Sequence, residues 1–160
     1  MEPRQVPAAF VNLSVHLTGF SETELLGTGM ISEYYDRVVS AIGDKPCGEL
    51  WAFNETLNQL ARAGSGSSAL THEIDSRLLS SDTLGPIARN IIKLWYLGSW
   101  PDADAKVGVA FTSAEAYRQG LIWKAMGTHP PGAKQPGFGS WSRVPVGGVA
   151  HEIEPAEKSS

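Results

Sequence analysis

The sequence is poor in cysteine, in charge and in long apolar runs. Its 160 residues include one cysteine, Cys47, which excludes an internal disulfide and any metal or haem site built from several cysteines of this chain. The longest apolar runs are only a few residues, which excludes a transmembrane helix. Charged residues make up 19% of the chain and the net charge is −4, so the basic surface typical of nucleic-acid binding is missing.

The common catalytic motifs are also missing. There is no Gly-x-Gly-x-x-Gly dinucleotide motif, no Gly-x-Ser-x-Gly elbow, and the stretch 64–68 lacks the Lys of a phosphate-binding loop. His72-Glu73 lacks the second histidine of a zinc motif, and the four histidines lie in four separate segments. We therefore expect that the chain is not itself an enzyme, binds no metal and holds no cofactor.

The remaining pattern predicts an all-α fold. Apolar residues recur at helical spacing through the first 126 residues, which we expect to form a body of about five helices. The capping-box pattern Ser21–Glu24 opens a helix predicted to run without interruption to Ile42. The other predicted helices start near Pro46, near Leu70, after Ser81 or Asp82 with an end at Gly98, and at the second capping box, Thr112–Glu115. A short extended piece is predicted at 107–111.

The composition of residues 127–160 predicts that they form an irregular arm and tail within a single domain. This stretch holds six Gly and five Pro among 34 residues, which forbids long helices and strands. It also contains Phe138 and Trp141, and such an arm has little means of burying these rings against itself. We therefore expect the arm to lie along a surface, either that of its own body or that of a partner.

Two aromatic-rich segments are the candidate interaction sites. In the segment 94–100, Trp95 is expected in the core; the rings of Tyr96 and Trp100 either cover the edge of the body or anchor a partner. In the segment 121–141, prolines stiffen the chain, and contact with a partner is favoured over packing on the chain's own body. The predicted partner contacts are Tyr96, Trp100, Trp123, His129, Pro130, Pro131, Phe138 and Trp141.

These segments carry a family resemblance. The run 87–98, with Ala88-Arg89 followed by Trp95-Tyr96-Leu97-Gly98, resembles a segment found in the small subunits of bacterial FAD-dependent sugar and sugar-alcohol dehydrogenases, a family similar to gluconate 2-dehydrogenase subunit 3. The stretch 116–141, with His129-Pro130-Pro131-Gly132 and Phe138-Gly139-Ser140-Trp141, is similar to the closing signature of that family. The stretch 10–19 matches its opening more loosely.

The resemblance implies a non-catalytic subunit. In such complexes a large subunit of the glucose–methanol–choline oxidoreductase class binds FAD and carries the catalytic histidine. The small subunit is helical and supports the folding, stability or export of the large one, and a multi-haem cytochrome c often accepts the electrons. We therefore expect this chain to stabilise the flavoprotein subunit of a glucose, sorbitol or glucoside 3-dehydrogenase. The alternative is a helical scaffold or regulatory protein that binds some other protein.

The N-terminal sequence bears on the cellular compartment of the protein. Many members of the family begin with a twin-arginine export signal, and this sequence has none. We therefore expect a cytoplasmic protein; the alternative, a periplasmic one, applies if the chain is a trimmed mature form.

Overall fold

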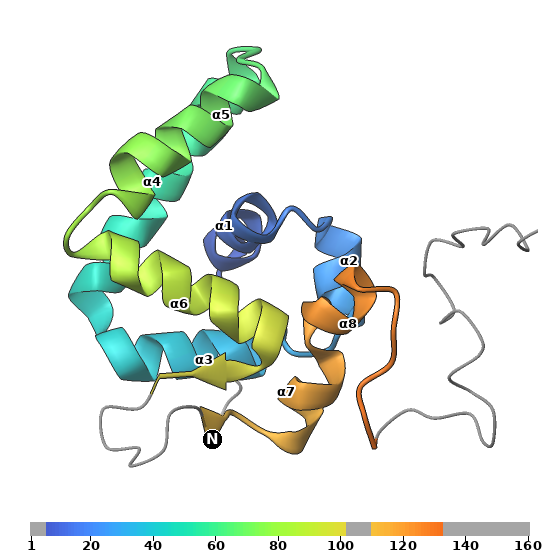
Figure 1. Ribbon diagram of the computed structural model, residues 1–160. Coiled ribbons are helices and arrows are strands. Elements are labelled where there is room, and N and C mark those ends of the chain that lie inside the picture. Colours follow the sequence, from blue (N-terminus) through green and yellow to red (C-terminus); the bar gives the residue numbers. More distant parts are fainter. Residues whose placement is uncertain (1–5, 102–109, 133–160) are drawn as a thin grey trace, which may run out of the picture.

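The computed structural model describes residues 6–101 and 110–132, and these residues are mostly helical, which confirms the all-α fold class (Figure 1). Within this part of the chain, no helix has the length and apolar character needed to cross a bilayer. The elements are α1 (Ala8–Thr18), α2 (Glu22–Gly27), α3 (Ile31–Ile42), α4 (Asp44–Arg62), α5 (Ser67–Glu73), the π-helix η1 (Ile74–Leu79), α6 (Leu84–Leu97), β1 (Ser99–Trp100), β2 (Ala110–Phe111), α7 (Ala114–Gln119) and α8 (Leu121–Ala125).

The helix α6 lies at the centre of the molecule. It contacts α1, α3, α4, η1 and α8, and its buried residues recur at helical spacing. Figure 1 shows α4 and α5 projecting together as a hairpin, while α7 and α8 lie against the far end of α6. The core therefore forms around α6, with the hairpin at one end and the C-terminal helices at the other. The largest fully buried side chains are Trp95, Tyr34, Phe10, Leu13, Leu25, Leu50, Leu57, Leu78, Ile91 and Leu94.

The helix α1 was not predicted, because its sequence mixes apolar and polar residues without a polar face. The structure shows how its buried polar residues are satisfied. The Ser14 hydroxyl donates to the Phe10 carbonyl at 2.8 Å, and the Thr18 hydroxyl donates to the Ser14 carbonyl at 2.7 Å. These bonds back to the preceding turn let both hydroxyls enter the core without losing hydrogen bonds.

The prediction of one uninterrupted helix from Ser21 to Ile42 is wrong. The capping box at Ser21 and Glu24 is confirmed, but α2 ends at Gly27 and α3 begins at Ile31. Gly29 between them has φ 70°, a left-handed conformation that ends a helix and that glycine adopts at low cost. The Thr28 hydroxyl oxygen accepts from the Met30 N–H across the break at 3.1 Å.

The C-terminal helix is likewise divided in two. The second capping-box pattern, Thr112–Glu115, predicted the start of α7 to within one residue: the cap is Ser113 rather than Thr112, and its hydroxyl oxygen accepts from the Ala116 N–H. The chain leaves the helix at Gly120, where a Cβ atom would lie 2.7 Å from the Tyr96 carbonyl oxygen, and α8 follows. Close approach to α6 therefore decides this break.

The other predicted helices are found close to their expected positions. Pro46 lies in the first turn of α4, the Ser81 hydroxyl accepts from the N–H of Leu84 at the start of α6, and Gly98 ends α6 with φ 68°. The helix predicted at 70–79 begins three residues earlier, as α5, and continues as η1. Of the extended piece predicted at 107–111, residues 110–111 pair antiparallel with β1; residues 107–109 lie outside the described part.

Candidate partner-binding surface

Trp95 belongs to the core, as predicted. Its side chain is 1% exposed, its indole N–H donates to the Ser14 hydroxyl oxygen at 3.0 Å, and the Tyr34 ring meets it edge-on with centroids 4.9 Å apart. Burial raises the pKa of the Tyr34 hydroxyl, and the neighbouring Glu33 carboxylate raises it further. This side of α6 is therefore a packed aromatic core rather than an interaction surface.

Tyr96 and Trp100 cover the edge of the body, one of the two alternatives left open above. The Tyr96 hydroxyl donates to the Thr18 carbonyl at 2.9 Å, and its ring packs edge-on against Phe20 at 6.0 Å. Trp100 on β1 is only 5% exposed. Because its ring is already inside the chain's own core, Trp100 has little surface left for a partner. Tyr96 is half-buried and keeps part of its ring at the surface.

Three rings from the C-terminal part form a continuous group, which we call the aromatic row: Phe111, Tyr117 and Trp123. Phe111 and Tyr117 meet edge-to-face with centroids 5.2 Å apart, and Tyr117 meets Trp123 in the same way at 5.4 Å. The Trp123 indole N–H donates to the Tyr117 carbonyl at 2.7 Å, which fixes the second ring pair. Phe111 is 53% exposed, so the row ends at the surface. Of these rings, only Trp123 was predicted as a contact residue.

The first residues of the predicted arm lie against this row. His129 is half-buried, Pro130 is buried and Pro131 is exposed. The Tyr117 hydroxyl donates to the Pro131 carbonyl at 3.3 Å. This part of the arm therefore packs on its own body, while Phe138 and Trp141 lie outside the described residues. Contact of the arm with a partner stays a prediction.

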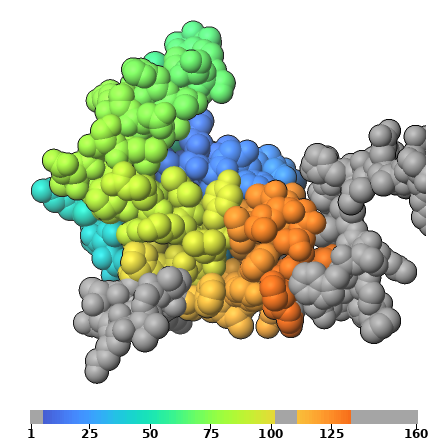
Figure 2. Space-filling view, viewed as in Figure 1, coloured from blue at the N-terminus to red at the C-terminus, as the bar shows by residue number. Residues whose placement is uncertain are grey.

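Four large apolar side chains are exposed among the described residues, at the ends of α2, α6 and α8 and on β2. These elements adjoin one another: α6 contacts α8, β1 pairs with β2, and α2 is joined to α8 by an ion pair. Figure 2 shows that α7 and α8 form one face of the molecule, away from the α4–α5 hairpin. Because apolar side chains are exposed on neighbouring elements, these elements are the candidate interaction surface. The exposed side chains are Leu26, Leu97, Phe111 and Met126.

An ion pair between α2 and α8 borders this face. The Lys124 ammonium lies 2.6 Å from the Glu24 carboxylate and 5.8 Å from the centroid of the Phe20 ring. The bond from Lys124 and the capping contacts with Ser21 lower the pKa of Glu24 to about 2. The capping role of Glu24 was readable from its spacing to Ser21. The pairing of Glu24 with Lys124, 100 positions away, could not be predicted, because no local pattern connects the two residues.

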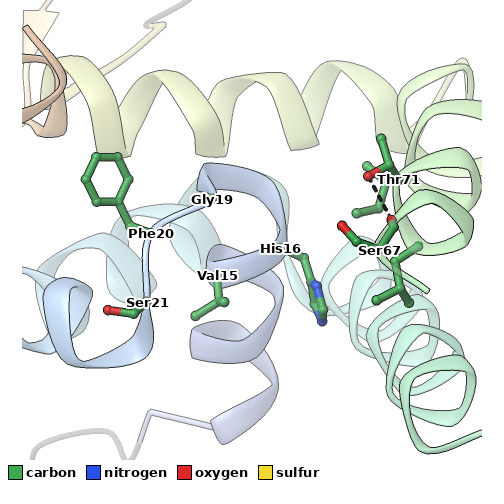
Figure 3. A pocket seen from close by; sticks show the side chains of 9 residues that line it. Val15, His16, Gly19, Phe20, Ser21, Ser67 and Thr71 are labelled. Atoms are coloured by element: carbon green, nitrogen blue, oxygen red, sulfur yellow. Dashed lines mark hydrogen bonds between the residues drawn. The ribbon is translucent and has the colours of Figure 1, made fainter. Parts of the chain in front are cut away.

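A second feature is an open groove beside α1. It has a volume of 440 Å³ and is lined by α1, the turn that follows it, α5 and η1. His16 projects into this gap from α1, with Ser67 and Thr71 across it (Figure 3). Burial lowers the pKa of His16, which favours the neutral ring. The Thr71 hydroxyl is bonded to the Ser67 carbonyl.

Metal-ligating side chains do not gather in the described residues: no group of three or more His, Cys, Asp or Glu occurs there. The structure therefore defines an all-α protein with an aromatic and apolar face at its C-terminal end. Comparison with known proteins found no matching family model, curated protein or solved structure.

Proposed function

We propose that this chain is a non-catalytic accessory subunit that binds and stabilises the large FAD-binding subunit of a sugar dehydrogenase. The proposal joins the resemblance carried by the segments 87–98 and 116–141 to the surface that those same segments build. FAD and the catalytic histidine belong to the partner in this assignment. The sugar and the electron acceptor follow from the partner's chemistry.

The observation that supports it is the exposure of large apolar side chains at the end of α8 and on the elements near it. Phe111 and Met126 are 53% and 65% exposed; Met126 lies within the segment 116–141, which carries the resemblance, and Phe111 lies just before it. Exposing such side chains to water costs free energy, roughly 25 cal/mol per Å² of apolar surface, which a partner recovers by covering them. Interfaces of permanent complexes are large and apolar in this way.

The proposal is tested by co-expressing the tagged chain with the reading frames next to its gene. The expected result is a yellow complex that contains oxidised flavin and reduces an artificial dye when a sugar is added. A colourless monomer that captures no flavoprotein would contradict the proposal. The scaffold alternative would then be the better account.

Variants of the exposed face locate the interface. We expect Phe111→Glu combined with Met126→Glu to reduce co-purification of the flavoprotein at least tenfold, because each change places a charge within a buried apolar contact. The control is Gln59→Glu, which adds a charge to the projecting α4–α5 hairpin and should leave co-purification unchanged. Equal yields from both variants would remove this face from the interface.

A further inference from the structure

The chain reverses direction at the end of α8. Gly127 has φ 63°, its N–H donates to the Lys124 carbonyl at 3.1 Å, and the Thr128 N–H donates to the Trp123 carbonyl at 2.9 Å. These two bonds form a Schellman motif, which ends a helix and folds the chain back over its last turn. The residues after Gly127 therefore turn back along α8, and they reach α7 where the Tyr117 hydroxyl bonds the Pro131 carbonyl.

The segment that follows this reversal, residues 129–132, is rich in proline. Proline fixes its own φ near −65° and restricts the residue before it to extended conformations. Pro130 and Pro131 therefore pre-set the short stretch from His129 to the turn at residues 131–132, where Gly132 has φ 73°, and a stretch restricted in this way loses little entropy on docking. The bond from the Tyr117 hydroxyl to the Pro131 carbonyl records its position beside the aromatic row, and Pro130, the residue before, is buried.

Proteins that recognise proline-rich segments combine the same two elements. Aromatic rings provide a flat apolar surface for the pyrrolidine rings, and a side-chain donor at that surface bonds a carbonyl of the extended segment. The aromatic row supplies the rings, and the Tyr117 hydroxyl supplies the donor. Trp123 adds rigidity, because its N–H is already committed to the Tyr117 carbonyl.

We propose that the aromatic row is a recognition surface for a short proline-containing segment, and that the chain's own residues 129–131, which lead into the turn at Gly132, are its resident ligand. The row thereby holds the start of the arm on α7 and sets the point at which the arm leaves the body. This inference concerns the isolated chain and does not depend on the proposed flavoprotein partner.

The first test removes the hydroxyl alone, in the full-length chain. We expect Tyr117→Phe to make hydrogen exchange of the Thr128 amide about two- to tenfold faster, the effect of losing one hydrogen bond that holds the returned segment. The control, Tyr96→Phe, removes the hydroxyl that bonds the Thr18 carbonyl and should leave this amide unchanged. An unchanged rate in Tyr117→Phe would overturn the proposal.

The second test supplies the ligand from outside. The probe is the peptide acetyl-Thr-His-Pro-Pro-Gly-amide, and the signal is the Trp123 indole N–H resonance in the full-length chain. We expect the peptide to shift this resonance at a concentration at least fivefold lower in the Pro130→Ala/Pro131→Ala variant than in the wild type, because the resident segment no longer competes. Equal midpoints, or no shift in either protein, would overturn the proposal. A wild-type response that depends on protein concentration would do so as well, since a second copy would then supply the segment.

Discussion

At the scale of single residues, the contacts between α6 and the C-terminal helices depend on the absence of side chains. Gly98 ends α6 with φ 68°, and its Cα faces the backbone of Ala116 in α7. Gly120 also lies close to α6: a Cβ atom there would be 2.7 Å from the Tyr96 carbonyl oxygen, compared with 2.4 Å between a Cβ atom at Gly98 and the Ala116 carbonyl. Two glycines thus let the backbone of the C-terminal part approach α6 directly, and this approach places the aromatic row where it is.

Gly98→Ala tests this close packing. A Cβ atom at this position would overlap the Ala116 carbonyl, and the backbone would also keep the alanine in the left-handed region. We expect a loss of at least about 2 kcal/mol in the free energy of unfolding, measured by urea denaturation.

The matched control is Gly64→Ala, which has φ 76° and no atom within 4 Å of the added Cβ. It should cost about 1 kcal/mol through its backbone conformation alone. Equal losses at the two glycines would show that the approach to Ala116 carries no extra constraint.

The pair of Ser14 and Trp95 gives a second prediction at this scale. Ser14→Ala leaves the buried Trp95 indole N–H without its partner, at an expected cost of about 1–3 kcal/mol in stability. Ser76→Ala removes a hydroxyl with the same bond to the carbonyl four residues earlier, but at an exposed position, and should change stability by less than about 0.5 kcal/mol. Thermal or urea denaturation of both variants gives the comparison, and similar losses would contradict the assigned role of Ser14.

At the scale of elements, short helices are held by contacts that are distant in sequence. The helix α8 has five residues and α2 has six, too short to be stable alone. They are held by the capping box of α2, by Leu121 buried in the core, and by the Lys124–Glu24 pair. Glu24 takes part in two of these contacts, so one carboxylate links the start of α2 to α8.

This link predicts a pH dependence. The pKa of Glu24 is lowered to about 2 in the folded protein, below its ordinary value of 4.5, so its pairing stabilises the fold above about pH 4.5 and is lost as the pH falls toward 2. We expect Lys124→Gln to be less stable than the wild type at pH 6, with a difference that narrows between pH 4.5 and 2. Because both groups are exposed, the difference should be small and should shrink in high salt.

Denaturation curves at several pH values measure this difference. Lys93→Gln is the control, since Lys93 is an exposed lysine of α6 that forms no ion pair with the described carboxylates. A difference for Lys124→Gln that stays constant down to pH 2 would contradict the assignment.

At the scale of the whole molecule, one aromatic cluster joins the N-terminal and central helices. Phe10 of α1 contacts the rings of Tyr35, Trp51 and Trp95, with centroids 5.6, 6.1 and 6.4 Å apart. These rings come from α3, α4 and α6, so four helices meet at one side chain. Loss of this contact should affect the entire fold rather than one helix.

Phe10→Ala is therefore expected to cost about 3–5 kcal/mol, since it removes a fully buried ring and leaves a cavity. Domains of this size are stable by about 5–15 kcal/mol, so the transition should move far down the denaturant scale as a single step. Phe111→Ala removes the same side chain from a position that is 53% exposed and should cost about 1 kcal/mol or less. Comparable losses, or local unfolding in Phe10→Ala, would contradict this account of the core.

Local pattern in the sequence was sufficient for much of the helical content. The capping residue Ser21, the start of α7 to within one residue and the stop at Gly98 were predicted because these effects act over a few neighbouring residues. The start of α1 at Ala8 and the break at Gly29 were not, because a weakly amphipathic stretch and a Gly within an apolar stripe leave the local pattern ambiguous. Tertiary contacts resolve both.

The same distinction between local pattern and tertiary contact applies to the candidate surface. From the sequence alone, the segments 94–100 and 121–141 were predicted to be interaction sites, because their richness in aromatic residues is a local property of the sequence. Only the tertiary structure decided that Trp100 is buried while Phe111 is exposed, and that Tyr117 meets Pro131 and Lys124 meets Glu24. Whether a side chain is buried or paired depends on which distant segments the fold brings together. The packing of the whole core determines which segments these are.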